Sequence, residues 1–341
     1  MSWSPQASTI AGLSLHKDLY DFGRLDTLGD ALDLQARAAS ETAQAAALDI
    51  DLFVEESFYA VLGAKAVLAA SEAAVTRSTT HRDFARARVG AQLMPPNELA
   101  RAEADLARYD VDRVRANGAL RSAQAVLAAA LGSPAASVDA GADDITFGEP
   151  ARDVPELRAA RDLLDAQRLN TRSIRDEMLP DLGVSAEFTG RAGGADVTTN
   201  PGPTGNGWVP DVPNWDALLV LTWPIYDRVV STRAEASKRQ EAVRTAELAQ
   251  VGEQLRTIAE RTAIELDVER SAQPALQRAL DAAQANHDQA EARFNGGLGT
   301  AVELSDAEAL LTDAQIQIAV GQFQLSRARA RLARVLAESS K

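Results

Sequence analysis

The chain has 341 residues and a net charge of −14 at pH 7, which excludes an ordinary nucleic-acid-binding protein because phosphates are bound by basic patches. It contains no cysteine, which excludes disulfides, a thiolate nucleophile and a cysteine-ligated metal site. Hydrophobic residues make up 46% and aromatic residues only 5%, and such an alanine-rich composition favours closely packed helices over a bulky globular core.

The first predicted element is a strand near the N-terminus, where Thr9, Ala11, Leu13 and Leu15 alternate with other residues. The opening residues, MSWSPQAST, lack the basic and apolar regions of a signal peptide. The sequence contains no run of about 18 apolar residues, so no transmembrane helix is predicted. Taken alone, these features indicate a cytoplasmic protein, an interpretation that conflicts with the strands and helices of the rest of the chain.

A long helix is predicted over residues 22–88, followed by a turn and a returning helix over 97–131. Apolar residues recur in the long helix at steps of three and four, as in coiled coils. A helix of this length is not stable by propensity alone and must lie along other helices. The stripe consists of Leu25, Leu28, Leu32, Ala39, Ala43, Ile50, Val54, Phe58, Val61 and Leu68.

Residues 135–153 are rich in turn-forming residues and are interpreted as a linker. A shorter helix is predicted over 154–178, and two strands over 182–190 and 215–223, joined by a loop at 191–214 that is rich in Gly, Pro and Asn. Strands of about nine residues with tryptophan on an apolar face are typical of a transmembrane β-barrel. The alternative is a small soluble sheet that caps a helical bundle, and alternation alone leaves both open. The apolar face carries Leu182, Val184, Ala186, Phe188, Trp215, Ala217, Leu219, Leu221 and Trp223.

A second long helix over 228–294 and a second returning helix over 300–338 repeat the first pair. A register held over more than 100 residues, with one insertion at the turn, indicates an internal duplication. The repeats are residues 1–134 and 154–341. The matching pairs are Tyr20 with Tyr226, Asp21 with Asp227 and Gly90 with Gly296, all 206 apart, and Leu99 with Leu304 and Leu131 with Leu336, 205 apart.

The glycine-rich stretch NGGLGTAVELSDAEALL at 295–311 suggests a phosphate-binding loop at first sight. Such a loop follows a strand and is usually followed by Lys or Ser/Thr, whereas helical sequence precedes this stretch and no Lys follows it. We therefore interpret Gly296, Gly297 and Gly299 as a turn between two helices, as Gly90 is in the first repeat.

Several motifs, in this order and spacing, resemble the TolC-type outer-membrane efflux protein family (outer membrane factors). A strand that leads through WPIYD into a very long helix is similar to the family's strand-to-helix junction, although Arg228-Val229 follows where the family usually has glycines. SFYAVLGAKAVL at 57–68 resembles a segment of the family's first long helix. RVGAQLMPPNELARAEADL and RFNGGLGTAVELSDAEALL resemble its two helix-turn-helix tips. The junction residues are Tyr20, Asp21 and Gly23 in the first repeat and Trp223, Pro224, Tyr226 and Asp227 in the second.

The resemblance covers nearly the whole chain and implies a mainly α fold with a small β part. Two tandem repeats of long, coiled-coil-like helical hairpins would form a trimeric α-barrel, and the strands would join a shared transmembrane β-barrel. It implies a passive, non-enzymatic exit duct of a tripartite efflux or type I secretion system, in the outer membrane with a periplasmic extension. The implied partners are two further copies, a periplasmic adaptor (membrane fusion) protein, an inner-membrane transporter and outer-membrane lipid, with no cofactor. Isolated strands and alanine-striped helices also need neighbours on physical grounds.

The resemblance also assigns roles to residues at the tips. Glu303 and Asp306 match the two acidic positions that ring the constricted entrance, and Glu98 matches an acid of the first tip that takes part in closing links. Where the family has the Arg and Tyr partners of those links, this chain has Gly299 and Phe294, so only the acidic ring is carried over. Alternatively, these acids only complement the helix dipole. The expected adaptor-docking residues are Val89, Gly90, Ala91, Gly296, Gly297, Leu298, Gly299 and Thr300.

Other residue patterns point away from catalysis. The histidines at positions 16, 81 and 287 are far apart in the sequence, so no metal site is expected, and no catalytic triad or carboxylate pair is indicated. The alternative function is a periplasmic helical-hairpin adaptor or scaffold outside the membrane. At an offset of 206, the counterpart of Val154 would precede residue 1, so we expect a further helix, strand and export signal upstream of this sequence.

Overall fold

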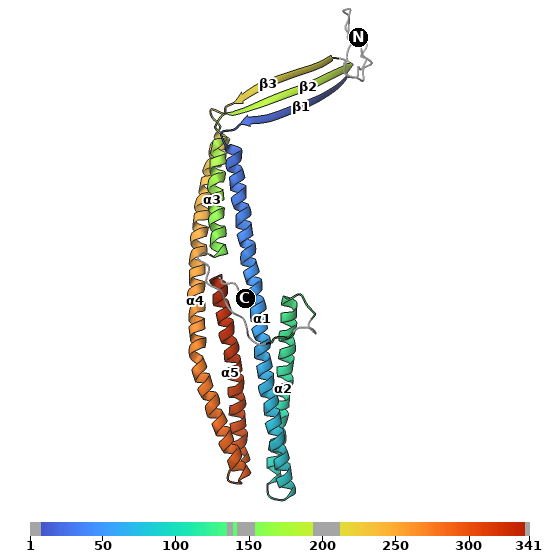
Figure 1. The fold of residues 1–341 in the computed structure, drawn as a ribbon, viewed down its shortest axis with the longest axis vertical. Coiled ribbons are helices and arrows are strands. Elements are labelled where there is room, and N and C mark those ends of the chain that lie inside the picture. Colours follow the sequence, from blue (N-terminus) through green and yellow to red (C-terminus); the bar gives the residue numbers. More distant parts are fainter. Residues whose placement is uncertain (1–7, 135–138, 142–153, 194–211, 338–341) are drawn as a thin grey trace, which may run out of the picture. The chain divides into compact units, whose positions relative to one another are not determined.

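The computed structural model describes residues 8–134, 139–141, 154–193 and 212–337. Most of the predicted linker at 135–153 and of the predicted loop at 191–214 lies outside these residues. In the described part, five helices and three strands follow one another in the order β1, α1, α2, α3, β2, β3, α4, α5 (Figure 1). The prediction of a mainly helical fold with a small sheet is confirmed.

The helices begin and end within three residues of the predicted positions. Both long helices are followed by a tight turn and a returning helix, as the duplicated sequence requires (Figure 1). The second long helix continues through Pro274. The helices are α1 (Arg24–Gly90), α2 (Pro96–Ala130), α3 (Pro155–Asp176), α4 (Arg228–Asn295) and α5 (Ala301–Val335).

The three strands form one antiparallel sheet in the order β1-β2-β3 (Figure 1). They are β1 (Ser8–Tyr20), β2 (Asp181–Gly193) and β3 (Val212–Thr222). β2 and β3 are each longer than predicted. The register of β1 shifts between Asp18 and Tyr20, at the end that leads into α1. The hairpin predicted from the alternating residues of β2 and β3 is present.

The register gathers the apolar residues of all three strands on one face of the sheet. Phe188 of β2 lies opposite Leu13 of β1 and Trp215 of β3. These apolar side chains are not covered: Trp215 is 78% exposed and Leu13 74%. The opposite face is richer in polar side chains, among them Ser14, His16, Asp18, Ser185, Glu187 and Asp216.

The chain divides into two compact units: residues 1–40 with 159–249, and residues 41–158 with 250–341. In the first unit, hydroxyl and amide groups join α3 to its neighbours. Thr171 and Ser237 are hydrogen-bonded at 2.9 Å, and Gln167 Nε2 donates to Ser237 Oγ at 2.9 Å. Hydrogen bonds between small polar side chains therefore hold these helices together, a role that large apolar side chains have in a bulkier core.

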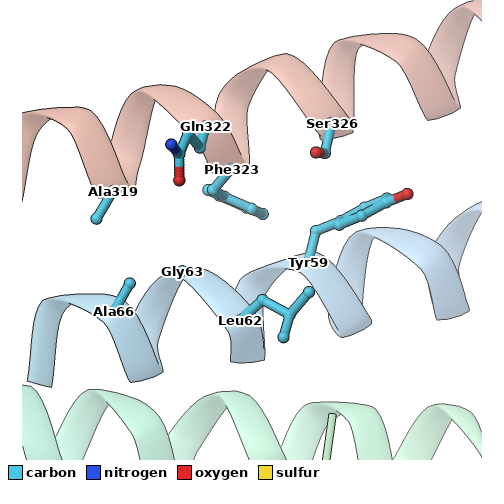
Figure 2. A pocket seen from close by; sticks show the side chains of 8 residues that line it. All are labelled: Tyr59, Leu62, Gly63, Ala66, Ala319, Gln322, Phe323 and Ser326. Atoms are coloured by element: carbon cyan, nitrogen blue, oxygen red, sulfur yellow. The ribbon is translucent and has the colours of Figure 1, made fainter. Parts of the chain in front are cut away.

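In the second unit, small residues let α1 and α5 approach each other closely. A Cβ atom added at Gly63 of α1 would lie 3.1 Å from Cβ of Phe323 in α5. Beside this contact is a cavity of about 170 Å³, lined by Tyr59, Leu62 and Ala66 of α1 and Gln322 and Ser326 of α5, among others (Figure 2). Gly321 brings α5 even closer to the side chain of Leu276 in α4.

The C-terminal half of α5 is fixed by arginine–carboxylate pairs. Arg331 contacts Glu56 of α1 at 2.6 Å and Glu265 of α4 at 3.0 Å, and Arg334 contacts Asp49 of α1 at 2.7 Å. Several of these side chains remain partly exposed, and each such pair contributes only about 0–1 kcal/mol. Their number, rather than any single pair, orders this part of the helix.

One result departs from the expectation that no helix is apolar enough to cross a membrane. α1 contains an 18-residue window with a mean hydropathy of 1.4, of which 33% is buried. Length and composition alone meet the criterion for a membrane-spanning helix, and core helices of soluble proteins meet it as well. In this structure α1 packs through Val61 against Leu127 of α2, which accounts for part of its apolar character.

Candidate functional site

The two helix-turn-helix tips are built by the same backbone hydrogen bonds, at an offset of 205 residues. Each long helix ends in a Schellman motif, in which a 6→1 bond and a 5→2 bond satisfy the last helical carbonyl groups. In the first tip, Leu93 N donates to Arg88 O at 2.8 Å, and Gln92 N donates to Val89 O at 3.0 Å. In the second tip, Leu298 N donates to Arg293 O at 2.8 Å, and Gly297 N donates to Phe294 O at 3.0 Å.

The residue that turns the chain in the first tip is Gln92, and the prediction that Gly90 does so is wrong. Gln92 has a left-handed φ of 61°, whereas Gly90 is the last residue of α1. The counterpart of Gln92 at the offset of 205 is Gly297, with a φ of 72°. The first repeat therefore has one residue more than the second within the long helix, before the turn.

The start of α5 is held by a capping box. Thr300 Oγ1 accepts a hydrogen bond from Glu303 N at 3.2 Å, and the Glu303 carboxylate accepts one from Thr300 N at 3.4 Å. Arg293 also lies 3.8 Å from this carboxylate. α2 begins after Pro95, which has no such side chain, and no cap bond forms there.

The three predicted gate acids lie in different environments. Glu303 is half-exposed and Asp306 is exposed, both on α5. Glu98 of α2 is half-buried, and its Oε2 has no hydrogen-bond partner. Pro95 occupies the cap position three residues earlier and has no N–H to donate, so the reciprocal capping bond that Glu303 makes is impossible for Glu98. Glu303 therefore caps the start of α5, where its negative charge also complements the helix dipole.

The two strand-to-helix junctions are stabilised by aspartates. Asp21 accepts hydrogen bonds from Gly23 N at 3.1 Å and Leu25 N at 2.8 Å. The bond from Leu25 lowers the pKa of the Asp21 carboxyl. Asp227 accepts in the same way from Val229 N at 2.7 Å. The neighbouring side chains of Tyr20, Trp223 and Tyr226 are largely exposed.

A group of buried polar residues near the tips was not predicted. Two of the three histidines, although far apart in the sequence, line one cavity of about 340 Å³ with Glu308 of α5 and Arg77 of α1. His81, His287 and Glu308 are 4–6% exposed. Among the residues that the structure describes, no three potential ligands are placed to hold a metal ion. A sequence signal existed: Glu308 occupies a position of the apolar stripe of α5, between Leu304 and Leu311.

Burial shifts the pKa values of this group away from charge. Burial raises the pKa of the Glu308 carboxyl to about 7, with Arg77 opposing the shift and Asp105 and Glu291 adding to it. Burial likewise lowers the pKa of His81 and raises that of Tyr109. At neutral pH, His81 is therefore neutral, and Glu308 is close to its titration midpoint.

Comparison with known proteins points to the same architecture. Residues 152–338 match the model of the family described as outer membrane efflux protein, which is just over half of the chain. A comparison with curated proteins gave no match.

Solved structures share the fold at low sequence identity. The chain is similar to CusC, with a TM-score of 0.82 and 16% identity, covering 97% of this chain and 82% of that one. It is similar to VceC from Vibrio cholerae, with a TM-score of 0.77 and 16% identity, over 98% and 87% of the two chains. It is similar to the MtrE outer membrane channel of Neisseria gonorrhoeae, with a TM-score of 0.74 and 16% identity, over 97% and 80%.

Proposed function

The chain belongs to the outer membrane efflux protein family, and we propose that three copies of it share one β-barrel and one helical tunnel as the outer-membrane exit channel of an efflux system. It is a transport conduit and not an enzyme. The family membership removes the alternative of an adaptor or scaffold outside the membrane.

The apolar face of the sheet is the observation that carries the trimer proposal. Leu15, Leu219 and Leu221 are 66–68% exposed, on the same face as Phe188 and Trp215. Exposed apolar side chains on one face and polar ones on the other fit a barrel wall between lipid and an aqueous interior. In the described sheet, β1 and β3 each have only one neighbouring strand, so their free edges need partner strands, and further copies of the chain supply them.

Substitution of Val184 by Arg tests this proposal. Val184 lies on the apolar face, opposite Leu219, so an arginine there would face lipid and cost about 2–4 kcal/mol near the bilayer midplane. We expect fewer heat-resistant trimers in membranes, measured by gel electrophoresis without boiling. Ser185→Arg is the matched control, because Ser185 points to the opposite, aqueous face. Equal assembly of the two variants would contradict the proposal.

The tips serve as the docking surface for a periplasmic adaptor, which connects the channel to an inner-membrane transporter. Leu93 and Leu298 follow the two Schellman turns and are 69% and 80% exposed. Apolar side chains held at matching positions of two rigid turns suit a partner that contacts both repeats. Of the docking residues predicted from the sequence, Val89 to Ala91 precede Leu93, and Gly296 to Thr300 include Leu298.

Glu303 and Asp306 form the acidic ring of the entrance, and Glu98 of the first tip belongs to the same gate. They lie three residues apart at the start of α5, so three copies would bring six carboxylates around the axis and favour cations. Glu303→Gln with Asp306→Asn should reduce cation selectivity in planar bilayers. Glutamine at 303 retains the capping box, so a loss of selectivity would report charge and not helix fraying. Unchanged selectivity would place the gate elsewhere.

A further inference from the structure

Near the tips of the second unit, a buried polar cluster joins α5 to α1 and α2. Arg77 Nη2 of α1 donates to Thr312 Oγ1 at 3.0 Å and lies 3.4 Å from Gln315 Oε1. Ser305 Oγ donates to Asp105 Oδ2 of α2 at 2.8 Å. Glu308 lies between Ser305 and Thr312 along α5, and Arg77 bonds to residues one and two turns beyond it.

The cluster contains several buried polar atoms that have no hydrogen-bond partner in the described structure. They are Nε of Arg77, Oγ of Ser78, both ring nitrogens of His81, Oη of Tyr109 and Nδ1 of His287. A buried polar atom without a partner destabilises the fold, and a buried charge without a partner does so more strongly. The arrangement is therefore tolerable for neutral side chains and strained for charged ones.

We propose that Glu308 and His81 form a proton-sensitive clamp between α5 and the α1–α2 hairpin, closed while both side chains are neutral and loosened when either becomes charged. The cost of a buried negative charge on Glu308 falls if Arg77 leaves Thr312 and Gln315 to pair with it, or if water enters through the adjoining cavity. Either change weakens the contacts of α5 with α1. A charged His81 would have both ring nitrogens buried without a hydrogen-bond partner.

The surroundings of both groups decide the direction of the response. The titratable and charged groups near Glu308 are Arg77 and His81 on α1, Asp105, Arg108 and Tyr109 on α2, and His287, Asp288 and Glu291 on α4; Glu98 and Arg101 of α2 also act on His81. Neither group gains a neutralising ion pair from this set, so burial dominates in both.

The two groups respond to pH with opposite signs. The pKa of Glu308 is about 7 in the closed clamp against 4.5 for a free carboxyl, so opening releases a proton and is favoured as pH rises from 4.5 to about 7. The pKa of His81 is lowered from 6.5 by burial, so opening takes up a proton and is favoured as pH falls below 6.5. Below 6.5 the two effects offset each other, and above it only that of Glu308 remains.

Hydrogen exchange of the α5 amides around Glu308 tests the clamp in the full-length protein. Rates are followed by mass spectrometry from about pH 5 to about pH 8, corrected for the pH dependence of chemical exchange. In Glu308→Gln, the opening equilibrium should fall by up to about tenfold per pH unit as pH rises to 6.5. In His81→Gln, it should rise by up to about tenfold per pH unit over the same range.

The controls separate the clamp from general destabilisation. Asp313→Asn removes an exposed carboxylate from the same helix and should keep the wild-type profile, and the double variant Glu308→Gln, His81→Gln should be flat. Opposite slopes in the two single variants support the clamp, and wild-type slopes in both overturn it. If a variant fails to fold, infrared difference spectra of the wild type decide: a carboxyl group that is still protonated near pH 6 supports the proposal, and its absence overturns it.

Discussion

The two tips make the same turn with different residues. In each, a Schellman motif ends the long helix, and the returning helix starts eight residues after the first carbonyl of that motif. The first tip uses Gln92 at the left-handed position and Pro95 at the cap. The second uses Gly297 and a Thr300–Glu303 capping box.

This difference shows that the backbone path of a tip does not depend on one set of side chains. The second tip follows the preferred local chemistry, because glycine enters the left-handed region at little cost and threonine satisfies an open N–H group. The first tip accepts strain at Gln92 and leaves Glu98 without its capping partner. Packing of the long helices therefore fixes the path, and local residues decide how stable each turn is.

The largest expected difference concerns the buried side chain of the second tip. Phe294 is 3% exposed and packs against Phe84 and Leu304, so Phe294→Ala should cost about 3–5 kcal/mol. Its counterpart Val89 is only partly buried, and Val89→Ala should cost under about 1 kcal/mol. Thermal unfolding of the two variants measures the difference. Equal losses would mean that the two tips are anchored alike.

The next comparison exchanges glycine and non-glycine at the left-handed position. Gly297→Ala should destabilise the second tip by about 1–2 kcal/mol, because a Cβ atom is disfavoured at this φ. Gln92→Gly should stabilise the first tip by roughly 1 kcal/mol for the same reason. Amide exchange at Leu298 and Leu93 reports each turn separately. Faster exchange at Leu93 in Gln92→Gly would show that the Gln92 side chain contributes something that glycine lacks.

The sequence predicted the elements of these tips but not their register. Apolar periodicity locates long helices well, because a stripe extends over many turns, and alternation located the strands of the sheet. The glycine at position 90 suggested the wrong turning residue, because glycine is the usual signal for a left-handed position and here Gln92 takes it. The cluster of Arg77, His81 and Glu308 joins one turn of α1 to a position of α5 far away in the chain, and single-sequence patterns carry no information on such pairs.

A smaller effect is expected at the cap of the second tip. Thr300→Ala removes the acceptor for Glu303 N and should cost about 1 kcal/mol, whereas Thr300→Ser keeps the hydroxyl and should cost less. Amide exchange at Glu303 and Leu304 measures the fraying. If the alanine and serine variants exchange alike, the capping box does not stabilise the start of α5.

The smallest effect is expected when the first tip is given the capping residue of the second. This exchange tests the difference between the two helix starts directly. Pro95→Thr supplies a hydroxyl for Glu98 N and an N–H group for the unpartnered Glu98 carboxylate, which completes a capping box worth about 1 kcal/mol. The backbone already fits, because Pro95 has φ −66° and ψ 147°, close to the φ −97° and ψ 155° of Thr300. Loss of the proline ring frees the unfolded chain and offsets about 0.4–1 kcal/mol of this gain. Pro95→Ala is the matched control, since it loses the ring without gaining a hydroxyl. Slower exchange at Glu98 in the threonine variant than in the alanine variant would show that the missing cap weakens the start of α2. Equal exchange would mean that the half-buried Glu98 is held by its surroundings and cannot turn towards a cap.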